Sequence, residues 1–364
     1  MNQVDFLIVG AGLAGCVLAE RLSSLGRKVL IVEKRNHIGG NCYDFIDNNG
    51  VLVHKYGPHY FRTNNDDVIE YLSQFTDWIK HDFKVKAYLQ GKLYPIPVNR
   101  DTINLFFNKN LKGVLETKAF LDKKRTRIKK PKNAEEQVLS VAGKEIYEAC
   151  FKRYTIKQWD MHPKNLDASV TARIPIRTNN DNRYFTDKFQ GLPRQGYTNM
   201  FKKLCQNCEV LLNTDYQEIK NKVLCDKLIF TGQIDSFFDY KFGKLPYRSL
   251  KINFERYEKE YYQDWLQINY PNDYKYTRIV EMKHATGQKI SCTTISKEYP
   301  TWNGEPYYPV PNLVNENSYQ KYKKEANKLS GVFFVGRLAQ YKYLNMDEVV
   351  GKALTLSKSL SILK

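Results

Sequence analysis

The stretch that decides the fold is VDFLIVGAGLAGCVLAERLSSLGRKVLIVEKR, residues 4–35. It starts with an apolar run at residues 4–9, short enough for a buried strand, and a turn with G-x-G-x-x-G spacing follows. Residues 16–26 have helical periodicity, and residues 28–33 form a second apolar run that ends in Glu33. The order of strand, glycine turn, helix and strand predicts a unit that binds a dinucleotide.

The glycines and the acid of this unit each have a physical role. Gly10 permits the tight turn, Gly12 lets backbone amides approach a pyrophosphate, and Gly15 lets the helix pack closely on the strand. The amino end of the helix supplies the positive end of its dipole, and Glu33 can accept hydrogen bonds from ribose hydroxyls. The glycine motif alone would be a weak signal, but in this context it predicts dinucleotide binding.

A second glycine pair indicates which dinucleotide is bound. Residues 34–44 read KRNHIGGNCYD, which resembles an extension found in FAD proteins of the glutathione reductase and amine oxidase type. NAD-only dehydrogenases lack this extension, so we expect FAD, bound without a covalent link. The contacts expected near the amino end of the chain are Gly10, Gly12, Leu13, Gly15, Glu33, Lys34, Gly39, Gly40 and Asn41.

Length and composition set limits on the rest of the chain. Its 364 residues exceed the roughly 250 to 300 that one hydrophobic core supports, so two or three units are expected. The sequence has no apolar window of about eighteen residues and no signal-peptide pattern, which predicts a cytoplasmic protein without stable membrane insertion. The seven cysteines suit reduced thiols, and nothing completes a zinc site with Cys205 and Cys208, so no metal is expected.

The formal net charge of +18 raises the question of a polyanionic partner. Part of the excess is local, because residues 123–132 read KKRTRIKKPK. This segment is either a solvated loop or helix end, or a contact with an anionic surface. No helix-turn-helix, zinc-finger or RNP pattern accompanies it, so no nucleic-acid partner is expected.

The pattern of the remaining chain predicts three parts. Helical periodicity runs from about residue 66 to 153, strand-like segments lie at 248–300, and a packing helix lies at 347–364. Apolar runs at 227–235 and 331–337 read as returning strands of the nucleotide fold. The predicted parts are an FAD-binding domain (1–80, 200–245 and 315–364), a helical domain (81–153) and an antiparallel-sheet substrate domain (154–199 and 246–314).

Five motifs resemble those of the UDP-galactopyranose mutase family. They are YTIKQWD (154–160), TARIPIR (171–177), DNRYFTDKFQGLPRQGYT (181–198), PYYPV (306–310) and FVGRLAQYKYLNMD (334–347). The resemblance runs from the first strand to the last helix. It implies an α/β chain with a discontinuous Rossmann-like FAD domain, an inserted helical domain often used for dimerisation, and an antiparallel sheet that lines the substrate cleft. A homodimer is therefore expected.

The chemistry implied by the resemblance converts a nucleotide sugar between its pyranose and furanose forms without net redox change. Reduced FAD attacks the anomeric carbon through N5 and expels the nucleoside diphosphate, which later returns. An external electron donor is needed to reduce the flavin. By default the substrate is UDP-galactopyranose, which becomes UDP-galactofuranose for cell-surface polysaccharide synthesis.

The resemblance also implies roles for individual residues. Arg173 and Arg278 correspond to a diphosphate clamp, and His59 to a histidine beside the flavin; these three are the candidate catalytic residues. The other implied substrate contacts are Tyr154, Thr155, Trp159, Tyr184, Phe185, Arg248, Asn269, Tyr308 and Tyr343. The implied flavin contacts near the last helix are Arg337, Asn345, Met346 and Asp347. Each tyrosine could instead be a core residue, and each arginine could belong to a surface pair.

Three positions depart from the commonest family pattern. Arg62 replaces a histidine, Cys150 stands where an aromatic residue often lines the nucleobase pocket, and Asn345 replaces an aspartate. Arg62 could tune the flavin, meet the substrate or point to solvent. A smaller residue at Cys150 could admit a thymine methyl group, which leaves dTDP-fucopyranose open as a substrate, and UDP-N-acetylgalactosamine is also open.

Two readings from other functional classes share the amino-terminal fingerprint. An FAD-dependent oxidase or desaturase would need neither the KQW segment nor the arginine pair. A binding protein without activity, like the GDP-dissociation inhibitors, would be colourless and would take up no FAD. The mutase reading differs from both because it requires bound, reduced flavin and leaves the mass of the substrate unchanged.

Overall fold

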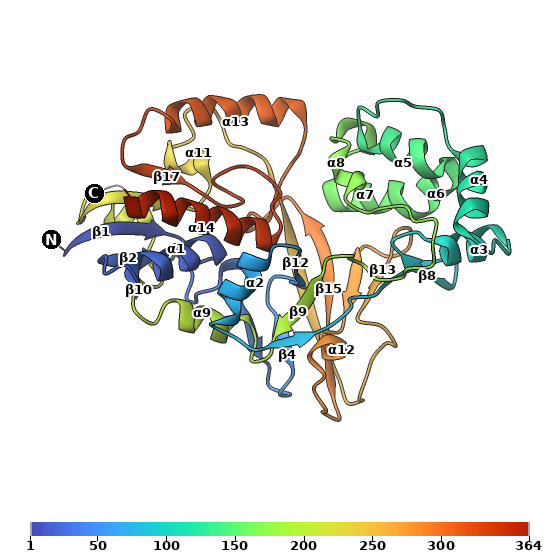
Figure 1. Cartoon of the computed structure of the whole chain (residues 1–364), viewed down its shortest axis with the longest axis horizontal. Helices are drawn as coiled ribbons and strands as arrows, with labels where there is room; N and C mark the ends of the chain where they lie inside the picture. The colour runs from blue at the N-terminus through green and yellow to red at the C-terminus, as the bar shows by residue number, and fades with distance from the viewer. Residues whose placement is uncertain (1, 363–364) are drawn as a thin grey trace.

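The computed structural model describes residues 2–362, and its first layer is a five-stranded parallel sheet. Its strand order is β10-β2-β1-β11-β17 (Figure 1). The strands are β1 (Asn2–Val9), β2 (Val29–Val32), β10 (Glu209–Leu211), β11 (Val223–Phe230) and β17 (Val332–Phe334). Strands β10, β11 and β17 come from the second half of the chain, so the predicted discontinuity of the nucleotide fold is present.

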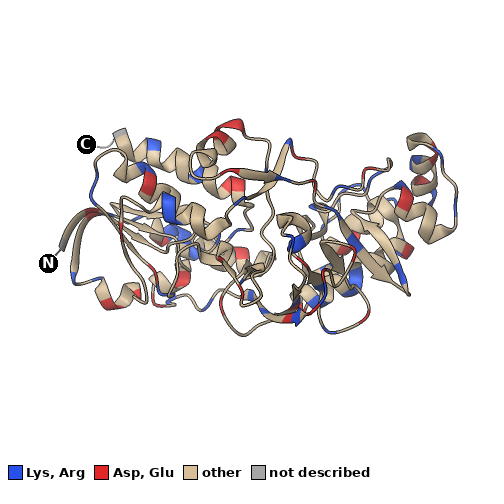
Figure 2. Ribbon diagram, turned by 90° about the horizontal axis from the view of Figure 1, so that it is seen from below, with Lys and Arg blue, Asp and Glu red and all other residues tan. Residues whose placement is uncertain are grey.

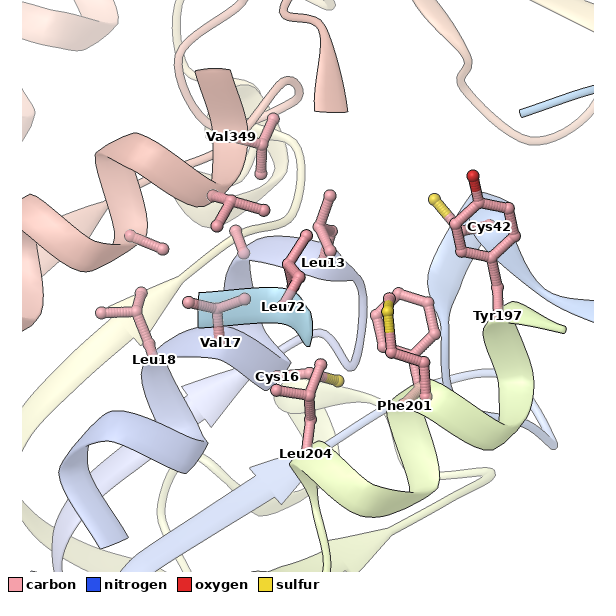
Figure 3. Packing of buried hydrophobic residues seen from close by; sticks show 14 of the residues in the cluster. Leu13, Cys16, Val17, Leu18, Cys42, Leu72, Tyr197, Phe201, Leu204 and Val349 are labelled. Carbon is pink, nitrogen blue, oxygen red and sulfur yellow. The ribbon is translucent and has the colours of Figure 1, made fainter. Parts of the chain in front are cut away.

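Helices cover both faces of this sheet because its strands alternate their side chains between two apolar layers. The helices of the FAD part are α1 (Leu13–Ser23), α2 (Asp66–Ser73), α9 (Tyr197–Leu204), α10 (Tyr216–Ile219), α11 (Ile234–Phe237), α13 (Leu313–Ala326) and α14 (Met346–Ile362), with a 3-10 turn η1 (Gly40–Cys42). Figure 3 shows Val17 of α1 close to Leu72 of α2, with Phe201 and Leu204 of α9 in the same cluster.

The carboxyl-terminal helix packs along α1, as its apolar stripe predicts. Val349, Ala353 and Leu360 are buried in the same core as α1, and Figure 1 shows the two helices side by side. Residues 363 and 364, at the end of the predicted helix, lie outside the described residues.

A seven-stranded sheet forms the second part of the molecule, in the order β16-β12-β15-β14-β13-β7-β8. Its strands are β7 (Val85–Leu89), β8 (Lys92–Ile96), β12 (Tyr247–Tyr257), β13 (Gln267–Asn269), β14 (Arg278–Val280), β15 (Thr293–Thr301) and β16 (Tyr308–Pro309), and α12 (Lys283–Thr286) follows β14. Neighbouring strands are antiparallel except β13 and β7, which pair in parallel. The predicted antiparallel sheet is therefore present, with one parallel pair.

The hairpin of β7 and β8 corrects the predicted start of the helical domain at residue 81. Residues 85–89 alternate between buried and partly buried side chains, as a half-buried strand does. Gln90 and Gly91 turn the chain with φ angles of 49° and 82°, which suits a two-residue hairpin turn. Residues 85–96 thus belong to the sheet, and helices begin only at residue 100.

The helical part extends further than predicted at its other end. It contains α3 (Arg100–Phe107), α4 (Val114–Lys124), α5 (Ala134–Ala142), α6 (Lys144–Ile146), the π-helical turn η2 (Tyr147–Lys152), α7 (Arg153–Trp159), the 3-10 turn η3 (Pro163–Asn165) and α8 (Ser169–Ala172). Residues 153–172 pack on α5 through Trp159 and Leu166, so the boundary at 153 was too early. Figure 1 shows these helices gathered away from the parallel sheet.

Two small sheets connect the main parts. One joins β5 (Phe61–Thr63), β9 (Phe189–Pro193) and β6 (Trp78–Lys80), and the other is the hairpin of β3 (Asp44–Ile46) and β4 (Leu52–His54). Lys and Arg residues recur along the whole length of the molecule in Figure 2. None of the helices within residues 2–362 combines the length and the apolar character needed to cross a membrane.

Candidate active site

A cavity of about 480 Å³ opens where β1, β2 and β11 end, the edge at which open α/β sheets bind nucleotides. It is lined by most of the residues predicted to contact the cofactor: Gly10, Gly12, Leu13, Glu33, Lys34, Gly39, Gly40, Asn41, His59, Arg337 and Met346. Gly15, Asn345 and Asp347 do not line it. The glycine loop and the second glycine pair therefore meet in one site.

Close contacts with neighbouring atoms explain why Gly10, Gly15 and Gly40 cannot carry a side chain without a shift of the structure. Gly10 has a φ of 101°, and a Cβ atom there would lie 2.2 Å from the Thr231 hydroxyl oxygen. A Cβ on Gly40, whose φ is 55°, would lie 2.9 Å from the Cα of Gly12. Gly15 acts behind the cavity, because its Cβ would lie 2.0 Å from the carbonyl oxygen of Gly10. Its role is helix packing rather than cofactor contact.

Two backbone amides fix the carboxylate of Glu33 in position. Its Oε2 accepts a hydrogen bond of 2.9 Å from the amide of Ala11, and its Oε1 accepts one of 2.9 Å from the amide of Arg35. The side chain is buried, yet it lines the cavity. Each carboxylate oxygen has a further lone pair, so Glu33 can also accept from ribose hydroxyls as predicted.

Several residues of the cavity wall carry no sequence motif. They are Thr214, Asp215, Tyr216 and Gln217 after β10, Thr231, Gly232 and Gln233 after β11, Asp239 and Tyr240, and Glu305, which lies beside Pro306 and Tyr307 of the PYYPV motif. Glu305 forms ion pairs of 3.1 Å with Lys34 and 3.2 Å with Arg35, which bring the loop before β16 over the cavity. The residues after β10 and β11 have one sequence signal, their position after the carboxyl ends of parallel strands, whereas Asp239, Tyr240 and Glu305 have none.

His59 lies at the edge of this cavity, in the loop after β4. Its amide donates a 3.1 Å hydrogen bond to Nδ1 of His54, and its own Nδ1 lies 2.9 Å from the carbonyl oxygen of Gly57. Burial, together with the neighbouring His54, lowers the pKa of His59 to about 3. The imidazole is therefore neutral at physiological pH.

Asn345 and Asp347 lie at the start of the last helix, outside the lining of the cavity. The amide of Asn345 donates a 2.7 Å hydrogen bond to Glu348, which caps the start of α14. Asp347 is half-buried, and burial raises the pKa of its carboxyl group. Arg337, by contrast, lines the cavity and donates a 2.8 Å hydrogen bond to the carbonyl oxygen of Leu344.

A group of arginines and tyrosines adjoins the cavity at Arg337. The guanidinium of Arg337 lies 4.9 Å from the ring centre of Tyr343, and the guanidinium of Arg173 lies 4.8 Å from it. The rings of Tyr308 and Tyr343 stack with centres 5.8 Å apart. Desolvation by the surrounding groups opposes ionisation of Tyr343, which is 37% exposed, but the charges of Arg173, Arg337 and Arg278 outweigh it and lower its pKa. The positive field of three arginines thus converges on one tyrosine.

Arg278 faces a buried acid that the sequence analysis missed. Its Nε lies 3.1 Å from Oε2 of Glu298, the residue opposite it on β15. Burial raises the pKa of Glu298, which the charge of Arg278 opposes. Oε1 of Glu298 has no hydrogen-bond partner within residues 2–362, and a Cβ on Gly57 would lie 3.0 Å from it. The pairing depends on strand register, which no sequence motif signals.

The predicted nucleotide wall lies on α7, but its tryptophan is largely a core residue. Trp159 is buried with Ala134, Leu166 and Val310, and its ring centre lies 6.3 Å from that of Tyr308. Thr155 is buried as well. Tyr154 lies close enough to Arg278 and Tyr184 for their charges to influence its pKa, which burial raises. Tyr154 and Tyr184 therefore belong to the group of arginines and tyrosines, whereas Trp159 packs in the core beside Tyr308.

Three weaker candidates have partners of their own. Arg248 is buried and donates a 2.9 Å hydrogen bond from Nε to the carbonyl oxygen of Gln158. The side-chain oxygen of Asn269 accepts a 2.8 Å hydrogen bond from Gln267. The Phe185 ring lies 4.7 Å from that of Tyr184. Arg248 thus holds the end of α7, and Phe185 supports Tyr184.

Comparison with known proteins adds independent evidence. A family model described as UDP-galactopyranose mutase matches residues 149–343, and a model described as NAD(P)-binding Rossmann-like domain matches residues 8–75. A probable UDP-galactopyranose mutase from Klebsiella pneumoniae is 38% identical over 362 residues, covering 97% of this chain and 94% of its own. A dTDP-fucopyranose mutase from Escherichia coli is 37% identical over 372 residues, covering 97% of both chains.

The solved structures agree with these relatives. A crystal structure of reduced UDP-galactopyranose mutase superposes with a TM-score of 0.80 at 17% identity, covering 100% of this chain and 95% of that one. The expected α/β class with a Rossmann-like domain is confirmed. The glycine cradle and the anchored acid fit FAD, which is the cofactor of this isomerase. Because a relative 38% identical over 97% of the chain accompanies the family model, the chain belongs to the UDP-galactopyranose mutase family.

Proposed function

We propose that this protein interconverts the pyranose and furanose forms of a nucleotide sugar, by default UDP-galactopyranose and UDP-galactofuranose. One observation carries the proposal: Arg337 lines the cofactor cavity, and its guanidinium lies 4.9 Å from the ring centre of Tyr343. The guanidinium of Arg173 lies 4.8 Å from the same ring centre. A binding site for a dianion therefore adjoins the site for the flavin. An oxidase of an uncharged or cationic substrate would not need this field.

The arginines suit the leaving group of such a reaction. A nucleoside diphosphate carries about two negative charges, and the planar fork of a guanidinium can donate two hydrogen bonds to phosphate oxygens. In this proposal Arg173 and Arg278 hold the diphosphate, and the hydroxyls of Tyr184, Tyr308 and Tyr343 donate around it. Bound FAD, in its reduced state, would supply the nucleophile for the anomeric carbon, and it requires an external electron donor.

His59 has a restricted role in this scheme. Because burial lowers its pKa to about 3, it can donate or accept a hydrogen bond as a neutral imidazole, but it does not bring a charge to the flavin. Glu298 acts on the substrate only through Arg278, whose Nε it holds at 3.1 Å. Arg278 can then present its other nitrogens to the diphosphate.

The identity of the sugar nucleotide is a separate part of the proposal. The named relatives include mutases of UDP-galactopyranose and of dTDP-fucopyranose at 38% and 37% identity, which does not separate the two substrates. Cys150 is buried in the core of the helical part with Ile146, Tyr147 and Phe151. UDP-galactopyranose is the default, and dTDP-fucopyranose and UDP-N-acetylgalactosamine are the alternatives.

A substrate panel tests the proposal. Dithionite-reduced protein is incubated with UDP-galactopyranose, dTDP-fucopyranose and UDP-N-acetylgalactosamine, and furanose products are resolved by chromatography. We expect one of them to isomerise without a change in mass, and only with reduced flavin. Turnover of none of the three, or oxygen-dependent oxidation of a substrate by the oxidised protein, would refute the proposal.

We further propose a homodimer formed through the helical part, in a reducing cytoplasm. Leu105 of α3 and Leu115 of α4 are 60% and 81% exposed, which is a large apolar area for a monomer to leave in water. The cysteines are free thiols, as a reducing compartment would keep them. Light scattering of the wild type and of L115D tests the dimer: a monomeric wild type, or an unchanged mass of L115D, would contradict it.

A further inference from the structure

The ammonium group of Lys157 is surrounded by backbone carbonyl oxygens. Lys157 is on α7, and its Nζ donates hydrogen bonds of 3.0 to 3.3 Å to the carbonyl oxygens of Asp273, Tyr274 and Tyr276, and also to that of Tyr270. All four acceptors belong to the loop between β13 and β14. The hydrogen-bond partners of Nζ within residues 2–362 are these four carbonyl oxygens.

This arrangement differs from that of an ordinary surface lysine. Burial lowers the pKa of Lys157 to about 8, and the nearby Asp273 opposes that shift. An ammonium has three N–H groups, whereas a neutral amine has two, so only the charged form can supply most of the four carbonyls. A hydrogen bond from a charged donor is roughly twice as strong as a neutral one, which makes this contact a firm link between α7 and the loop.

The two segments joined by this link carry the proposed substrate contacts. On one side, α7 carries Tyr154 and Trp159. On the other side, Asn269 and Arg278 pair across β13 and β14 directly before and after the loop. The loop is closed at its base by a 2.8 Å hydrogen bond from the amide of Tyr270 to the carbonyl oxygen of Thr277. Any shift of the loop is therefore transmitted to the strand of Arg278.

We propose that Lys157 is a positioning residue that fixes the nucleotide wall on α7 relative to the diphosphate arginine on β14. A nucleotide spans from its base to its diphosphate, so the distance between these two elements sets how well it binds. Arg248 holds the end of α7 to β12 through the carbonyl oxygen of Gln158, and Asn272 of the loop donates a 2.9 Å hydrogen bond to the carbonyl oxygen of Ala149 in the turn before α7. Lys157 adds the link from the side chain of α7 itself to the loop beside Arg278. The inference rests on the proposed function, since it assumes that a nucleotide sugar occupies this cleft.

The test uses the K157M and K157Q holoenzymes, with K152M as the matched control. Lys152 lies in the preceding helical turn and forms an exposed ion pair of 2.9 Å with Glu148. Titration with UDP gives the dissociation constant, kinetics with the wild-type substrate give KM and kcat, and amide hydrogen exchange follows residues 270–276. We expect UDP affinity to fall and KM to rise by about tenfold or more, as loss of a charge-assisted contact predicts.

The other measurements separate positioning from a general loss of structure. In both Lys157 variants we expect kcat to change less than KM, exchange in residues 270–276 to become faster, and FAD content and reduction potential to stay the same. K152M should match the wild type throughout. If K157M purifies without FAD, K157Q supplies the comparison, because its amide can still donate to the carbonyl groups.

The outcomes that overturn the proposal are specific. Unchanged UDP affinity and KM in both variants would show that the loop needs no such link for binding. An equal loss in K152M would show that charge in general, and not this contact, is responsible. If the wild type binds no UDP and isomerises no nucleotide sugar, the proposed function fails; unchanged exchange in residues 270–276 would then reject the link itself.

Discussion

Nη1 of Arg62 donates hydrogen bonds of 2.9 Å to both carboxylate oxygens of Asp187. The guanidinium also lies 4.5 Å from the ring centre of Phe185, so one side chain holds two residues of the loop before β9. That loop is further fixed by a 2.8 Å hydrogen bond from the amide of Lys188 to the side-chain oxygen of Asn64. Arg62 is therefore a loop anchor next to Tyr184, and its charge is paired with an acid.

This pairing predicts how R62H will behave. A shorter histidine keeps some contact with Asp187 but loses the stacking on Phe185, so the Tyr184 loop should loosen and KM should rise by about threefold to tenfold. The flavin reduction potential should stay the same, because the charge of Arg62 is already balanced. Potentiometric titration and steady-state kinetics check both parts; a shifted potential with unchanged KM would assign Arg62 to the cofactor instead. D187N should reproduce the KM effect.

Removal of Arg278 should abolish turnover without removing the cofactor. In R278A the diphosphate loses one arm of its clamp, and kcat/KM should fall by about a hundredfold or more, as expected for truncation of a buried charge pair. Absorbance of bound FAD should be unchanged because Arg278 does not line the cofactor cavity. R183A is the control, since Arg183 pairs with Asp181 near the surface. Retained turnover in R278A would remove this residue from the clamp.

E298Q should lower activity and alter the pH dependence of stability. Glutamine keeps an acceptor near Arg278 but removes its counter-charge, so kcat/KM should fall by about tenfold. Burial raises the pKa of Glu298 in the folded protein. Above the pKa that glutamate has in the unfolded chain, Glu298 therefore keeps its proton in the native state after the unfolded state has lost it. This residue's contribution to stability therefore decreases with rising pH.

Thermal unfolding at two pH values tests whether the contribution of Glu298 to stability decreases with rising pH. The melting temperature of E298Q relative to the wild type should be higher at pH 8 than at pH 5, because the substitution removes a buried carboxylate whose ionisation is costly. The opposite trend would mean that Arg278 stabilises the ionised acid more than burial disfavours it. E255Q is a suitable control, since Glu255 is a partly exposed partner of Lys297.

G40A should impair cofactor binding more than G26A does. Both glycines have positive φ angles, 55° and 75°, so alanine introduces backbone strain of about 1 kcal/mol at either position. At Gly40 the added Cβ lies 2.9 Å from the Cα of Gly12, whereas at Gly26 no heavy atom of residues 2–362 outside its chain neighbours lies within 4 Å of it. FAD content and the FAD dissociation constant should therefore change in G40A and remain wild-type in G26A. Equal FAD affinity in both variants would contradict the packing argument.

The sequence by itself determined the parts that follow local rules. In residues 4–35 the strand, glycine turn and helix are specified by neighbours only a few positions apart, and the cavity forms where that spacing predicts it. The helices from residue 100 onward and the stripe of α14 follow from apolar periodicity in the same way. The arginines and tyrosines of the cleft could be selected because their motifs resemble those of a known family.

The tertiary structure decided which of these residues meet. Glu298 faces Arg278 only because β14 and β15 pair in that register, and Arg62 meets Asp187 across 125 positions of the chain. Lys157 and its four carbonyl groups lie more than 110 positions apart. Such contacts depend on how sheets and helices pack, and strand register carries no local signal in a single sequence. The sequence shows which charged and aromatic side chains are present, whereas long-range packing determines which of them come into contact.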